Sequence, residues 1–138
     1  MRELLLLNLG GMNYGVWKDE VLSIKDVQTI HRLPLSPTCI AGMSILDGRT
    51  ATLADLSVCI GLAPMSRQKK GHILIMSEQE KITGFVVAGE VASITVPDDS
   101  VHPMPGYLRT PVLDTCVVHA SQPVPVILLS SQSYYDTT

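Results

Sequence analysis

The sequence predicts an all-β protein built from two small barrels. Helical periodicity is nearly absent, and short apolar or alternating runs are separated by Gly, Pro, Asn, Asp and Ser, a pattern typical of a barrel or sandwich. Each half of the chain offers four or five such runs and ends in a hairpin, which suits a small barrel. A polar and basic stretch, Ala63 to Gly71, separates the halves. We therefore expect a first barrel over residues 1–64 and a second over residues 71–130.

Turn residues set the limits of the strands in the first half. Gly10-Gly11 and Asp47-Gly48 suit two-residue hairpin turns, which need positive φ angles. Leu33–Pro37 is expected to be irregular, because proline lacks an amide donor and restricts its predecessor. Asp55 is a suitable N-cap for one short helical turn. The predicted elements are strands over Leu4–Leu9, Asn13–Trp17, Val21–Asp26, Ile40–Leu46 and Thr50–Leu53, then a helical turn over Leu56–Leu62.

The second half repeats this arrangement. We expect one hairpin around Ser77–Lys81 and a last one around Ser121–Pro123. Four prolines in Pro97–Pro111 predict an irregular crossing between them. The predicted strands are His72–Met76, Ile82–Val87, Val91–Val96, Val112–Ala120 and Val124–Leu129.

Composition excludes several classes of protein. The 138 residues are 46% hydrophobic and 17% charged, enough apolar material for a packed core. The apolar runs are far shorter than the roughly 18 residues of a membrane helix, and the N-terminal one is too short for a secretory signal. We therefore expect a cytoplasmic protein that does not insert into membranes. A net charge of −3 and one basic cluster without aromatics, Arg67–Lys70, argue against nucleic-acid binding.

Cysteine and histidine positions do not indicate catalysis or metal binding. Cys39, Cys59 and Cys116 are odd in number and widely spaced, which does not suggest a disulfide framework. Only Cys116 and His119 are locally paired, and that spacing places them on opposite faces of a strand, whereas a zinc site needs about four converging ligands. Asp114 and Cys116 share a face, but His119, the base that a cysteine nucleophile needs, does not. We expect no enzyme, no metal and no cofactor.

Gly42 interrupts a predicted strand, where glycine normally weakens the element. It marks either a bulge or barrel corner, or a place where another backbone approaches closely, as at a docking site. Gly84, in the strand Ile82–Val87, poses the same choice.

The most specific run in the chain is Cys39–Leu56, a glycine hairpin that ends in Asp-Leu. An apolar strand, a strand with Tyr14 and a proline loop precede it. With the spacing of Pro37, Gly42 and Gly48, this order resembles the first subdomain of the CheW family. Residues 71–129 fit the family more loosely, so residues 1–138 as a whole resemble a single CheW-like domain.

The resemblance implies a fold and a set of partners. The fold would be two five-stranded, SH3-like barrels around a shared apolar seam. The function would be a non-enzymatic scaffold that couples the cytoplasmic tip of methyl-accepting chemoreceptors to the regulatory domain of a CheA-type histidine kinase. Receptor tips would lie in a groove between the barrels, and barrel ends would pair with the kinase domain. The positions that fall in the receptor groove are Val21, Ile24, Gly42, Asp47 and Val87.

Four residues depart from the family pattern. Asp47 stands where the family has an arginine, and Ser23, Thr52 and Ala88 replace a glutamate, a proline and an aspartate. Interfaces depend on a few residues, so these changes are expected to alter partner choice without harming the fold. The alternatives are a self-associating structural protein of the same fold that has lost kinase coupling, and a small-ligand-binding barrel or enzyme.

Overall fold

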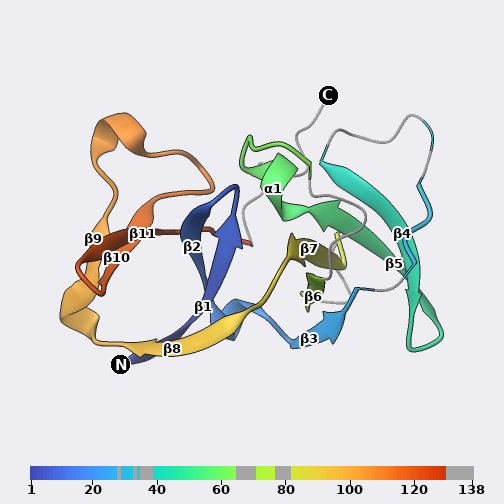
Figure 1. Ribbon diagram of the computed structural model, residues 1–138, viewed down its shortest axis with the longest axis horizontal. Coiled ribbons are helices and arrows are strands. Elements are labelled where there is room, and N and C mark those ends of the chain that lie inside the picture. The colour runs from blue at the N-terminus through green and yellow to red at the C-terminus, as the bar shows by residue number, and fades with distance from the viewer. Residues whose placement is uncertain (28, 33, 35–38, 65–70, 77–81, 130–138) are drawn as a thin grey trace.

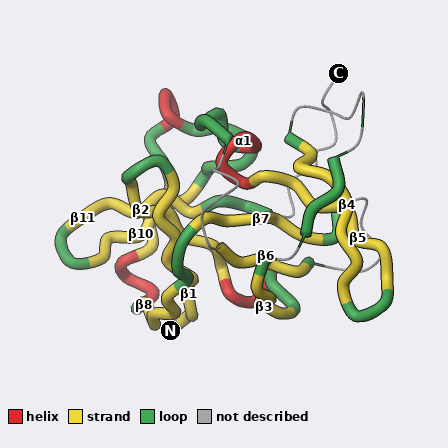
Figure 2. The backbone as a smooth tube through the Cα atoms, turned by 45° about the vertical axis from the view of Figure 1, so that its right-hand side comes forward, coloured by secondary structure: helices red, strands yellow, loops and turns green. Residues whose placement is uncertain are grey.

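The computed structural model describes residues 1–27, 29–32, 34, 39–64, 71–76 and 82–129. Within these residues the strands form a six-stranded sheet and a five-stranded sheet. The hairpins β10–β11 and β4–β5 lie at opposite ends of the molecule, with β6 and β7 between them (Figure 1, Figure 2). The prediction of an all-β protein with two small barrels is confirmed.

The six-stranded sheet has the order β8-β1-β2-β11-β10-β9, and the five-stranded sheet has the order β3-β6-β7-β5-β4. The strands of the first sheet are β1 (Arg2–Leu9), β2 (Met12–Trp17), β8 (Ala92–Val96), β9 (Val101–Pro103), β10 (Thr115–His119) and β11 (Gln122–Val126). Those of the second are β3 (Ser23–Asp26), β4 (Ile40–Leu46), β5 (Arg49–Asp55), β6 (Gly71–Ile75) and β7 (Gly84–Ala88), with helix α1 (Leu56–Cys59) after β5.

The two sheets do not divide the chain at the predicted boundary. The N-terminal hairpin β1–β2 joins the C-terminal strands, whereas residues 23–88 supply the five-stranded sheet. This hairpin is held on both sides, because β1 pairs antiparallel with β8 and β2 lies parallel beside β11. The division into residues 1–64 and 71–130 is therefore corrected. Turn signals identify a hairpin, but they do not say which distant strands it pairs with.

Among the described residues, three hairpins close on two residues with positive φ. These are Gly10-Gly11, Asp47-Gly48 and Ala120-Ser121, with φ between 51° and 87°. The first two turns are confirmed. The third lies nearer the N-terminus than predicted, because Pro123 and Pro125 belong to β11. Prolines at alternate positions leave the amides between them to pair with β10.

Two further expectations are refined by the structure. The crossing Pro97–Pro111 contains a short edge strand, β9, because His102 pairs with Cys116 of β10. Helix α1 begins after Asp55 as predicted, with the Ser57 amide donating to Asp55 Oδ1 over 3.0 Å, but it ends at Cys59. Most of Leu33–Pro37 and Ala63–Gly71, and the whole turn Ser77–Lys81, lie outside the described residues.

Both sheets curl until their ends meet. In the five-stranded sheet, His31 forms an antiparallel bridge to Met43 of β4, with backbone hydrogen bonds of 2.7 and 2.8 Å. In the six-stranded sheet, β8 turns through the short 3-10 helix Asp98–Ser100 directly into β9, which pairs at the other edge. Closure of this kind leaves few unpaired edges.

The buried apolar side chains form three clusters. One fills the six-stranded barrel around Leu4 and Trp17, and another fills the five-stranded barrel around Leu53 and Ile73. The third and largest draws on both sheets and on α1, and we call it the seam. Its buried members are Leu5, Leu7, Leu9, Val16, Ala54, Leu56, Leu74, Met76, Ile82, Phe85, Val87, Val112, Ile127 and Leu129.

No helix among the described residues is long and apolar enough to cross a membrane.

Candidate partner-binding surface

Two apolar side chains are exposed beside β3, at one edge of the five-stranded sheet. Ile24 is 41% exposed and Leu22, just before the strand, is 70% exposed. Leu22 lies at the bend that leads into β3, where its amide donates to the Ile75 carbonyl over 2.8 Å. We call these two exposed side chains the β3 patch. Ile24 pairs with Leu74 of β6, a buried member of the seam. The exposed Ile24 side chain therefore lies on the same face of the sheet as Leu74.

Val21 lies just before β3, next to Leu22. Its side chain is half-buried and packs against the seam. Its amide donates to the carbonyl of Lys18 over 3.0 Å, which closes the 3-10 turn Lys18–Glu20 before β3. Val21 thus helps to fix the direction in which the chain enters β3.

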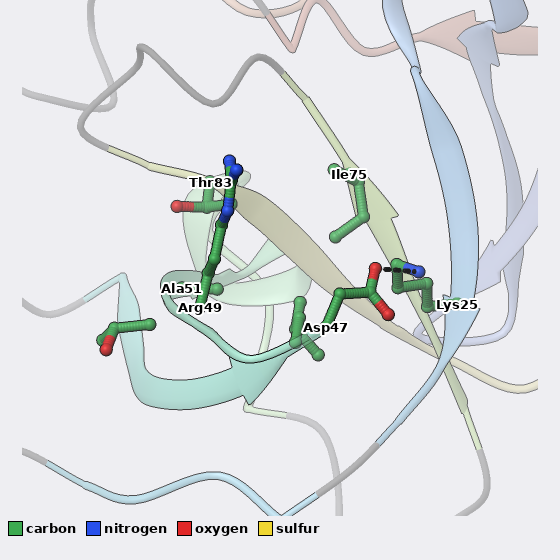
Figure 3. Close-up of a pocket in the computed structure, with 8 residues that line it drawn as sticks. Lys25, Asp47, Arg49, Ala51, Ile75 and Thr83 are labelled. Atoms are coloured by element: carbon green, nitrogen blue, oxygen red, sulfur yellow. Dashed lines mark ion pairs between the residues drawn. The ribbon is translucent and has the colours of Figure 1, made fainter.

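Asp47 lies at the exposed tip of the β4–β5 hairpin and pairs with Lys25 of β3 over 2.7 Å. Because Lys25 follows Ile24 in the strand, this ion pair is on the opposite face of β3 from the Ile24 side chain. Figure 3 shows the Lys25 amine directed at the Asp47 carboxylate, with Arg49 elsewhere on the wall of the same hollow. The hollow has a volume of about 440 Å³ and is lined by Lys25, Leu46, Asp47, Arg49, Thr50, Ala51, Ile75 and Thr83.

Gly42 and Val87 were expected to lie in the partner groove, but both are buried. Val87 is 1% exposed and packs in the seam, so the structure corrects the expectation that its side chain lines a groove. Gly42 is buried in a bulge of β4, and a Cβ there would lie 2.3 Å from the His31 carbonyl oxygen. The backbone that approaches Gly42 closely is the chain's own.

The structure thus separates the five predicted residues. Ile24 is exposed on one face of β3, and Asp47 pairs with Lys25 on the opposite face. Val21 is half-buried, and Gly42 and Val87 are buried. Leu22, the most exposed apolar side chain next to β3, was not predicted. The signal that could have found it is an apolar residue directly before a short edge strand.

The cysteine and histidine pair of β10 lies on the surface of the six-stranded barrel. Cys116 is half-buried opposite Pro125, and His119 is exposed opposite Gln122. In the part of the chain that the structure describes, no three His, Cys, Asp or Glu side chains are grouped so that they could hold a metal ion.

The comparisons with known proteins agree with this architecture. The model of the CheW-like domain family matches residues 3–130 of the 138. The chain belongs to the CheW-like family. The chemotaxis protein CheW of Klebsiella aerogenes is 23% identical over 109 residues, which cover 79% of this chain and 66% of that protein. The crystal structure of the scaffolding protein TtCheW from Thermoanaerobacter tengcongensis superposes with a TM-score of 0.80 at 20% identity. That match covers 93% of this chain and 84% of the other.

Residues that depart from the CheW-like pattern are accommodated by local contacts. The Thr52 amide donates to Thr83 Oγ1 over 3.3 Å, an interaction that a proline at this position could not make. Ser23 is exposed on β3, and half-buried Ala88 ends β7 opposite Gly71. Asp47 adopts a φ of 52° in its turn, a conformation that aspartate tolerates better than most residues. Ser23 and Asp47 are exposed, so these two differences lie on the surface.

Proposed function

We propose that this chain is a non-enzymatic adaptor of chemotaxis signalling, which couples chemoreceptors to a CheA-type histidine kinase. The observation that carries the proposal is the match of the CheW-like family over residues 3–130. The two-barrel fold and its likeness to a CheW scaffolding protein support it. The family resemblance implies binding to the cytoplasmic tips of receptors, so we propose that this protein is cytoplasmic.

The β3 patch is the surface we propose for the receptor tip. Leu22 and Ile24 are exposed and apolar, and Ile24 pairs with Leu74 of the seam, so a helical hairpin with an apolar stripe would bury them on docking. The ion pair of Asp47 with Lys25 borders the same strand from its other face. A negative charge where the family resemblance implies an arginine favours a partner with a basic group at that point.

The first experiment is a titration of the protein with the cytoplasmic tip of its cognate receptor. Ile24→Asp places a charge in the contact, and desolvating that charge opposes binding. We expect affinity to fall tenfold or more, which is about 1.4 kcal/mol. Folding should survive, because Ile24 is 41% exposed.

Val118→Asp is the matched control. Val118 is also a β-strand aliphatic residue and is 46% exposed, but it lies on β10 of the other barrel. It should bind the receptor tip as the wild type does. Equal losses in both variants, or none in either, would contradict the assignment of the β3 patch.

The same preparations test the adaptor role itself. The wild type should bind both the receptor tip and the kinase regulatory domain, and a ternary complex should form when all are mixed. The adaptor proposal would be contradicted if the protein binds neither the receptor tip nor the kinase regulatory domain and sediments as a homo-oligomer.

A further inference from the structure

The tip of the β4–β5 hairpin carries the only Asp-Gly sequence in the chain, Asp47-Gly48. Leu46 pairs with Arg49 across the turn, so these two residues alone form it. Their φ angles are 52° and 78°. The Asp47 side chain is 77% exposed, and a Cβ at Gly48 would meet nothing within 4 Å. Other parts of the fold therefore leave both residues of the tip room to change conformation.

The Gly48 amide is available as a nucleophile. It lies outside the β4–β5 ladder, and among the described residues it donates to no backbone carbonyl. Glycine also has no side chain to shield this nitrogen from the neighbouring carboxyl carbon. Asp99 is exposed as well, but the amide that follows it is engaged, because Ser100 donates to the Pro97 carbonyl over 3.0 Å. Of these two exposed aspartates, Asp47 alone is followed by an amide that can attack it.

We propose that Asp47-Gly48 is a site of spontaneous isomerisation, at which Asp47 is converted to isoaspartate. The Gly48 nitrogen attacks the protonated side-chain carboxyl of Asp47. The amide proton and the carboxyl hydroxyl leave as water, and a cyclic succinimide forms. Water then adds to the main-chain carbonyl carbon of Asp47 and breaks its bond to nitrogen, so the backbone now runs through the Asp47 side chain. The water lost in the first step is regained in the second, and the product has the mass of the original chain.

Lys25 opposes the first step. Its Nζ lies 2.7 Å from Asp47 Oδ2, and Figure 3 shows the amine directed at the carboxylate. Because Lys25 belongs to β3, the ion pair draws the carboxylate toward that strand, whereas the attack needs the carboxyl carbon turned toward the Gly48 nitrogen. The ion pair therefore slows isomerisation without preventing it, since exposed ion pairs are weak and are screened by salt.

Isomerisation would change both the turn and the position of its charge. It adds the Cβ atom of Asp47 to the main chain, and the geometry of a two-residue hairpin turn leaves no place for an extra backbone atom. The carboxylate is then attached directly to Cα, without the methylene group through which it now reaches Lys25. We therefore expect the isomerised protein to melt at a lower temperature than the unmodified protein.

The test incubates the full-length chain at neutral pH and physiological temperature and digests samples with trypsin over time. The tryptic peptide that carries the turn, residues 33–49, contains Asp47 as its sole aspartate and has no asparagine. Isoaspartate in it is detected by electron-transfer fragmentation and by methyl transfer from an isoaspartyl methyltransferase. We expect isoaspartate to accumulate at Asp47, while the peptide that contains Asp99 stays unmodified.

Lys25→Gln should speed this accumulation by up to about fivefold, the factor by which an exposed ion pair favours its bound form. Lys18→Gln is the matched control, because Lys18 makes a similarly exposed ion pair with Glu3 over 2.8 Å. It should isomerise at the wild-type rate. Sodium chloride at about 1 M screens exposed charges, so it should also speed the reaction in the wild-type chain, where no variant has to fold.

Three outcomes would overturn the proposal. They are a peptide 33–49 that keeps only aspartate throughout the incubation, isoaspartate that appears at Asp99 as fast as at Asp47, and equal rates in Lys25→Gln and Lys18→Gln. None of these measurements involves the receptor tip or the kinase, so their result is independent of the proposed adaptor function.

Discussion

At Gly42 the backbone of β4 has a φ of +147°, and the carbonyl oxygen of His31 fills the space where a side chain would begin. The neighbouring Met43 makes both backbone hydrogen bonds of the His31 bridge. A residue with a Cβ would therefore have to move the segment that closes the five-stranded barrel. Glycine at this position is explained by barrel closure alone.

Gly42→Ala should lower the free energy of unfolding by about 3 kcal/mol, since it combines an unfavourable φ with a steric overlap. Gly106→Ala is the control, because a Cβ at Gly106 meets nothing within 4 Å and its φ is not positive. Urea unfolding of both variants is the measurement. Equal stability of the two would show that β4 does not approach His31 in this way.

Asp47 lends itself to a charge test, because its side chain is 77% exposed. Asp47→Arg removes an exposed ion pair and places a less tolerant residue at a φ of 52°, so it should lower the free energy of unfolding by about 1–2 kcal/mol. It should weaken binding to the cognate partner and strengthen binding to a receptor tip of the usual family type. Asp47→Asn removes the charge and keeps a residue that tolerates the turn.

Titrations of both receptor tips against these two variants provide the measurement. If Asp47→Arg and Asp47→Asn bind each tip as the wild type does, the carboxylate has no part in partner choice.

Among the larger elements, the β10–β11 hairpin differs from the other two in its turn. Ala120 and Ser121 hold φ angles of 51° and 61° without a glycine, whereas the β1–β2 and β4–β5 turns contain one or two. A left-handed residue with a Cβ is strained. The sequence gives no glycine or asparagine signal here, which is why the turn was placed too late.

Ser121→Gly should raise the free energy of unfolding by about 0.5–1 kcal/mol, because glycine adopts this φ without steric cost. Gly48→Val, in the equivalent turn of β4–β5, should lower it by about 1–3 kcal/mol. Thermal melting of the pair tests the turns together. Shifts in the same direction for both variants would contradict the shared turn geometry.

Across the whole molecule, the seam couples the two barrels. Phe85 of β7 is 1% exposed and packs there with residues of β1, β2 and the segment after β11. Trp17, the only tryptophan, lies inside the six-stranded barrel. A substitution in the five-stranded barrel should therefore change the unfolding transition that Trp17 fluorescence reports in the six-stranded barrel.

Phe85→Ala should cost about 3–5 kcal/mol, as for other large buried aromatic residues. Melting followed by Trp17 fluorescence and by far-ultraviolet circular dichroism should shift together, because the barrels share one core. Tyr107→Ala, at an 87% exposed position, should leave both curves unchanged. A Trp17 transition that stays at the wild-type temperature would mean that the barrels unfold independently.

The sequence alone determined the local structure of this protein. Glycine, proline and aspartate limit where strands stop, so the turns at Gly10-Gly11 and Asp47-Gly48 and the cap at Asp55 were predicted correctly. These features depend on the φ preferences and hydrogen bonds of neighbouring residues, which the sequence contains directly.

Only the tertiary structure decided which strands share a barrel and which predicted site residues reach the surface. The hairpin β1–β2 pairs with β8 and β11, far along the chain, and Val87 and Gly42 are covered by other segments. Which strands pair depends on how the seam as a whole is buried. Residues of β1 and residues 127 and 129 both contribute to the seam. No local pattern records that choice, because many pairings satisfy the same alternation of apolar and polar residues.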